Sequence, residues 1–184
     1  MRIAVPAAAL GVCVALAGCG SSSKTGSTSP SSVGPAQTTV AKPGAQPSES
    51  SRMICSTEAQ TDIEASLGVK ATVSTPTWVG HVYACKYTYP QGAITLSVKE
   101  LESQAEVTAE YNADAKKLGR RPDTVSFGQG AFITTNGSVI VRKDNKVLDV
   151  DVSGIPENFG SPPQDRSNVA LSIAATVMSC WTGA

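Results

Sequence analysis

The sequence predicts an α+β domain in which an antiparallel sheet of about six to seven strands packs with three helices, in the order α-βββ-α-ββββ-α. Two observations predict this class. Apolar residues alternate with polar ones over short segments, as in Ile94, Leu96 and Val98, whereas other segments place apolar residues at helical spacing. Turn residues link the alternating segments directly, and long runs of hairpin-linked strands favour an antiparallel sheet covered by helices.

The domain is expected over residues 53–184. The two Trp, four Tyr and three Phe of the chain all lie between Trp78 and Trp181, so an aromatic core cannot begin much earlier. A domain of this length buries roughly two-thirds of the surface of its unfolded chain. We expect a signal peptide over residues 1–18 and a tether over 19–52 in front of it.

The first helix is expected to begin with Thr57 as its cap, because Gln60 follows three residues later as in a capping box. Gly68 is expected to end it. The apolar residues at helical spacing between them are Ala59, Ile63 and Leu67. A short strand near 70–75 and a loop over 76–80 should follow.

The segment 81–89 is predicted as a strand, and a turn at 90–92 leads to a second strand. Ile94, Leu96 and Val98 should lie on one face of that second strand, and Thr95, Ser97 and Lys99 on the other. A second helix is expected to end at Gly119. Its apolar positions are Leu101, Ala105, Thr108, Tyr111, Ala115 and Leu118.

The carboxyl-terminal half is expected to contain strands near 123–127, 131–135, 138–143 and 146–152. Asn136-Gly137 is a strong signal for a two-residue hairpin turn. Asp149 and Asp151 alternate with apolar residues and should face water. The last helix should carry one apolar stripe, formed by Val169, Ile173, Val177 and Trp181.

The amino terminus has the features of a secretory signal. Arg2 is followed by a short apolar stretch that Pro6 and Gly11 interrupt, too short for a bilayer span of about 20 residues. Leu16-Ala17-Gly18-Cys19 comes next and resembles the lipobox of bacterial lipoproteins. That resemblance implies cleavage before Cys19, a diacylglycerol on its thiol, and a further acyl chain such as palmitate on the new amino terminus. Several acyl chains would anchor the chain stably in a membrane.

The tether of residues 19–52 begins at the lipidated cysteine and is rich in Ser, Thr, Pro, Gly and Ala. Its branched apolar residues are Val33 and Val40. Such a segment buries too little apolar surface to offset the entropy of ordering it, so we expect disorder. As a flexible coil it would span roughly 30 Å between its ends.

Three cysteines remain for the domain in an oxidising compartment: Cys55, Cys85 and Cys180. They permit three disulfide pairings. We favour Cys55–Cys85, which would tie the start of the first helix to the aromatic strand, with Cys55–Cys180 as the alternative. A buried thiol is the simplest role for Cys180 under the first pairing.

The chain resembles uncharacterised actinobacterial lipoproteins of the mycobacterial and streptomycete type. The resemblance is carried by the lipobox and tether, by Cys55 before a helix that ends Leu67-Gly68, and by the Cys85-Lys86-Tyr87 strand. A later Phe127-Gly128-Gln129-Gly130-Ala131 turn adds to it. It implies a place in the cell envelope and a Cys55–Cys85 bridge, and it implies no activity.

Charge and composition exclude several functions. Fifteen Lys and Arg balance fifteen Asp and Glu, so nucleic acid is not an expected partner. The one histidine, His81, would lie about 13 Å along the strand from Cys85, too far for a catalytic pair. No metal, cofactor or catalytic residue is predicted, and we expect a protein that is not an enzyme.

The aromatic residues Trp78, Tyr83, Tyr87 and Tyr89 offer two interpretations, core packing or a platform for a ligand. The sequence thus predicts a monomeric lipoprotein on the extracytoplasmic face of the cell membrane, which binds an envelope protein, a wall polymer or a small ligand. A carrier of a lipid or another apolar molecule is the alternative.

Overall fold

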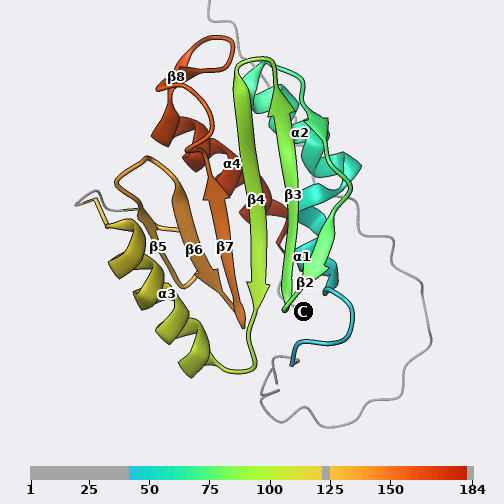
Figure 1. The fold of residues 1–184 in the computed structure, drawn as a ribbon, viewed down its shortest axis with the longest axis vertical. Helices are drawn as coiled ribbons and strands as arrows, with labels where there is room; N and C mark the ends of the chain where they lie inside the picture. Colours follow the sequence, from blue (N-terminus) through green and yellow to red (C-terminus); the bar gives the residue numbers. More distant parts are fainter. Residues whose placement is uncertain (1–41, 122–124, 182–184) are drawn as a thin grey trace, which may run out of the picture. The chain divides into compact units, whose positions relative to one another are not determined.

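The computed structural model describes residues 42–121 and 125–181, and these residues form an α+β fold (Figure 1). Within them, a seven-stranded antiparallel sheet has the order β1-β3-β4-β7-β6-β5, with β2 also pairing with β3. The predicted fold class is confirmed. The residues of the signal, the lipobox and most of the tether lie outside the described part.

The two longest strands, β3 (Val82–Tyr89) and β4 (Gly92–Glu100), form a hairpin at the middle of the sheet. The other strands of the sheet are β1 (Thr72–Val73), β2 (Thr77–Val79), β5 (Gly130–Ile133), β6 (Val139–Lys143) and β7 (Lys146–Asp151). A separate small hairpin consists of β8 (Asn158–Phe159) and β9 (Gln164–Asp165).

The helices lie on both faces of the sheet. The helix α2 (Thr57–Leu67) and the helix α4 (Arg166–Cys180) contribute to one large apolar cluster with the sheet. The helix α3 (Gln104–Leu118) forms a smaller cluster with β5, β6 and β7 on the opposite face. The short α1 (Glu49–Arg52) and η1 (Met53–Cys55) precede α2.

Sequence alternation explains how one sheet supplies both clusters. Leu148 and Val150 of β7 point into the large cluster, whereas Val147 points toward α3. Successive side chains of a strand point to opposite faces, so a strand buried on both sides reads as nearly continuous apolar sequence. The run Val139-Ile140-Val141 of β6 is buried throughout for this reason.

The ends of α2 follow local side-chain chemistry. Gly68 ends the helix in the left-handed conformation with φ 64°, as predicted. A Cβ there would come within 2.0 Å of the Ser161 carbonyl oxygen. The cap at the other end is Ser56 rather than the predicted Thr57, because the Ser56 hydroxyl accepts the Ala59 N–H at 3.1 Å.

The described fold begins upstream of residue 53. We call residues 42–52 the amino-terminal strap. It includes α1, and Ser51 within it is fully buried. Glu100, at the end of β4, accepts hydrogen bonds from the Ser48 N–H, the Ser48 hydroxyl and the Ser51 hydroxyl at 2.8, 2.6 and 2.5 Å. The last part of the expected tether therefore packs on the domain.

Several expected elements differ. Residues 77–79, expected in a loop, form β2, since they pair with β3. Of the strand expected near 123–127, residues 125–127 are not in a strand and the rest lie outside the described residues. The β5–β6 connection takes residues 134–138 rather than two, although Asn136-Gly137 lies in it.

Candidate binding surface

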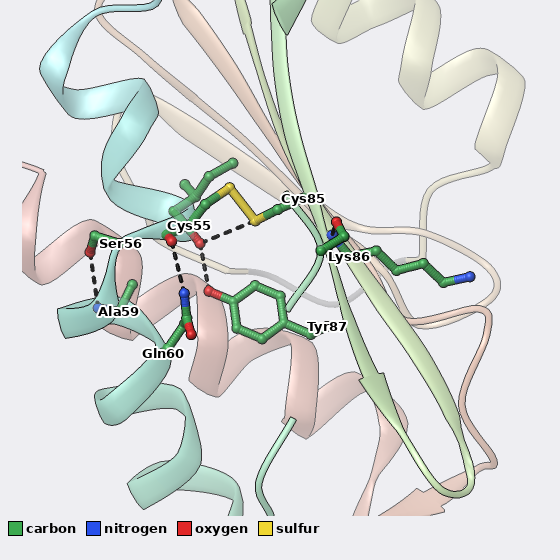
Figure 2. The surroundings of a disulfide bond; sticks show 9 residues. Cys55, Ser56, Ala59, Gln60, Cys85, Lys86 and Tyr87 are labelled. Carbon is green, nitrogen blue, oxygen red and sulfur yellow. Dashed lines mark hydrogen bonds between the residues drawn. A yellow bond between two sulfur atoms is a disulfide. The ribbon is translucent and has the colours of Figure 1, made fainter. Parts of the chain in front are cut away.

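The Cys55–Cys85 disulfide is present and joins η1 to β3 (Figure 2). The pairing that we favoured is confirmed, and Cys180 is a half-buried residue outside this bond. Beside the disulfide, the Tyr87 hydroxyl donates to the Ile54 carbonyl oxygen at 2.7 Å. The bridge and this hydrogen bond together hold the chain before α2 against the centre of the sheet.

The four aromatic residues of the predicted platform do not form one exposed surface. Tyr87 and Tyr89 are 1% and 5% exposed, and burial raises the pKa of the Tyr89 hydroxyl to about 12. Trp78 and Tyr83 are half-buried cross-strand neighbours. The Trp78 indole donates to the Ala45 carbonyl oxygen at 3.1 Å, so it holds the strap.

The sheet face of β3 and β4 that points away from the large apolar cluster has no helix of the described chain over it. We call it the uncovered face. Figure 1 shows β3 and β4 with no helix in front of them. The helix α3 packs instead against β5, β6 and β7. Strand register brings the side chains of this face into rows across the sheet: Lys86, Thr95 and Asp151 form one row, and Ala84, Ser97 and Asp149 form the next.

A hollow of about 520 Å³ lies at one end of this face. Lys86 projects to this side of β3, away from Cys85, Tyr87 and α2 (Figure 2). The hollow is lined by the polar side chains of Lys86, Thr88, Thr95, Asp151 and Ser153, and Tyr89 lines it as well.

The base of the hollow depends on a close approach of two backbone segments. The Ala93 N–H donates to the Gly154 carbonyl oxygen at 3.0 Å. At Gly92, φ is 147°, and a Cβ would come within 2.1 Å of that same oxygen. Glycine at this position therefore lets the loop after β7 close the end of the hollow.

Lys86 and Asp151 carry opposite charges on the two sides of the hollow. The ion pairs in the described part of the chain are Lys42–Glu102, Lys70–Glu64 and Lys99–Glu110, and neither residue belongs to one of them. The Asp151 carboxylate is held in place, because its Oδ1 accepts from the Ser153 N–H at 2.9 Å and the Ser138 hydroxyl at 3.2 Å.

Asp149 lies in the next row, between the uncovered face and α3. Its Oδ1 is buried without a hydrogen-bond partner, so the prediction that Asp149 faces water is wrong. The pKa of Asp149 is raised from 3.8 to about 7, mainly by burial and in addition by the carboxylates of Asp151 and Asp114. Lys117 of α3 opposes this shift.

Sequence reasoning missed the uncovered face as a site, although it assigned Thr95, Ser97 and Lys99 to a common side of one strand. The signal was available in the alternation of β3, where Ala84, Lys86 and Thr88 occupy the same side. The positions of α3 and of the 153–154 loop could not be read from alternation, because both depend on contacts between distant segments.

In comparisons with known proteins, no protein-family profile, curated protein or solved structure matches the chain. Among residues 42–121 and 125–181, no group of three or more His, Cys, Asp or Glu side chains is arranged to hold a metal ion. The helices within the same ranges include none with the length and apolar character that crossing a bilayer requires.

Proposed function

We propose that this chain is a lipid-anchored, non-catalytic binding module on the extracytoplasmic face of the cell membrane. The signal-like amino terminus and the lipobox-like Leu16-Ala17-Gly18-Cys19 support the anchor. The Cys55–Cys85 disulfide fits an oxidising compartment outside the cytoplasm. The resemblance to actinobacterial lipoproteins stays a prediction.

The observation that carries the binding role is the uncovered face with its hollow, whose lining includes the charged side chains of Lys86 and Asp151. A strand face without a covering layer leaves Lys86, Thr88 and their neighbours accessible to a partner. An apolar carrier would need interior space, and the region between the sheet and the helices α2 and α4 holds side chains such as Leu96 and Ile173, which are at most 1% exposed. The uncovered face therefore favours binding of a polar partner.

One membrane preparation tests both parts of the proposal. A photo-crosslinking residue is placed at Thr95 on the uncovered face, and as a control at Thr61 on the exposed side of α2. After irradiation in cells, we expect adducts from position 95 and not from position 61. Mass spectrometry of the same membrane fraction should find a lipidated peptide that begins at Cys19.

Two outcomes would contradict the proposal. Equal yields of adducts from the two positions would contradict the binding role of the uncovered face. A mature chain that retains Arg2, or that carries an unmodified Cys19, would contradict the lipid anchor.

A further inference from the structure

We infer that the hollow on the uncovered face binds a zwitterion of about dipeptide size, with its ammonium group at Asp151 and its carboxylate at Lys86. The inference rests on the proposed binding function and names the chemical class of ligand. It is carried by the register of three strands, by the two charges and by the hydroxyl groups between them.

The spacing of the two charged residues fits this size. Lys86 and Asp151 lie in one row with Thr95 between them, so their Cα atoms are two strand spacings apart, about 9.5 Å. At about 3.5 Å per residue an extended dipeptide spans about 7 Å, so when it lies over this row its two ends come within reach of the Lys86 and Asp151 side chains.

The charges favour a zwitterion over a neutral ligand. Neither Lys86 nor Asp151 has an ion-pair partner in the described fold, as shown above. A neutral polyhydroxyl ligand lying over them would remove water from both charges and supply no opposite charge. A zwitterion replaces that water with one charge-assisted contact at each end.

Side chains that carry hydroxyl groups lie beside the two charged residues in the hollow. Thr88, Thr95 and Ser153 supply hydroxyl groups that can donate to or accept from a peptide unit. Tyr83 and Tyr87 of β3 belong to the other face, where they contact the large apolar cluster. Tyr89 lines the hollow but is only 5% exposed, so it offers little of the stacking surface that a sugar ring would use.

The test is calorimetric titration of the full-length protein, purified from membranes in detergent, with L-alanyl-L-alanine. Two blocked probes, N-acetyl-L-alanyl-L-alanine and L-alanyl-L-alaninamide, each remove one ligand charge. We expect saturable binding of the free dipeptide and about fivefold weaker binding of either blocked probe, the size of effect that a partly exposed ion pair gives.

Two variants assign the ends of the ligand. Lys86→Met should bind the dipeptide and its amide equally, while it still discriminates against the acetylated probe. Asp151→Asn, which keeps the Oδ1 acceptor for Ser138 and Ser153, should show the reverse pattern. Lys116→Met and Asp62→Asn change exposed helical residues away from the hollow and should bind like the unaltered protein.

Equal binding of all three probes, or no saturable binding of the dipeptide, would overturn the inference. Binding of cellobiose without binding of the dipeptide would overturn it in favour of a neutral glycan. If Thr95 still crosslinks a partner in cells while the dipeptide does not bind, the ligand class is wrong and the binding role of the uncovered face is retained.

Discussion

At the scale of single residues, Asp149 shows what sequence alternation leaves out. The pattern of β7 correctly separates Asp149 and Asp151 from Leu148 and Val150. It does not reveal that α3 packs against the side of the strand that carries the aspartates. This helix lies some thirty to forty residues earlier in the chain. The buried, unpartnered Oδ1 of Asp149 results from that long-range contact.

The raised pKa of Asp149 predicts a pH-dependent cost in stability. Below about pH 4 the carboxyl is protonated in both the folded and the unfolded chain, and it has no effect. Between pH 4 and about 7 only the unfolded chain ionises, so the stability falls as the pH rises. Above pH 7 the cost is complete, roughly 4 kcal/mol at about 1.36 kcal/mol per pKa unit.

Asp149→Asn should therefore raise the free energy of unfolding more at pH 8 than at pH 4. Urea denaturation at both pH values measures the difference. Asp62→Asn, on the exposed side of α2, should change stability equally at the two pH values. An Asp149→Asn effect that is the same at pH 4 and pH 8 would mean that Asp149 is not the buried acid.

At the scale of elements, the strap differs most from expectation. Its composition correctly indicates little apolar burial, but Ser48 and Ser51 pack through hydrogen bonds to the buried Glu100. Burial raises the pKa of Glu100, but the hydrogen bonds from Ser48 and Ser51 outweigh it and lower the pKa below its usual value. Since the contact joins residues about 50 positions apart, composition could not predict it.

Ser51→Ala should destabilise the protein by about 1–2 kcal/mol near neutral pH, because the buried Glu100 carboxylate loses a donor. The contribution should shrink as the pH falls through the lowered pKa of Glu100, where protonation removes the charge. Thermal denaturation at pH 7 and pH 3 measures both effects. Ser179→Ala, an exposed serine of α4, is the matched control and should have little effect at either pH.

The other elements show which signals are local. Helix ends at Gly68 and Gly119 and the faces of β3 and β4 were predictable, because glycine conformation and alternation act within a few residues. The shift of the α2 cap from Thr57 to Ser56 arises because both side chains are good caps. β2 was not predictable, since three residues become a strand only through pairing with β3.

At the scale of the whole molecule, the two faces of the sheet are covered unequally. The large cluster joins the sheet to α2 and α4, and α4 buries Val169, Ala170, Ile173, Ala174 and Val177 along its length. On the other face α3 buries Val107 and Tyr111 against Phe132, Ile140 and Val147. The Asp149 Oδ1, which is buried without a hydrogen-bond partner, also lies on the α3 side.

Because α3 buries fewer apolar side chains than α4, we expect α3 to unfold locally before the rest of the fold. Local stability follows buried apolar contact, so the amide protons of α3 should be protected from exchange about tenfold less than those of α4. Hydrogen–deuterium exchange with mass spectrometry measures both helices in one sample. At pH 8 the ionised Asp149 should weaken the α3 contact further, so Asp149→Asn should raise protection in α3 and leave α4 unchanged. Equal protection of the two helices, or a uniform response to Asp149→Asn, would instead mean that the two layers unfold as one unit.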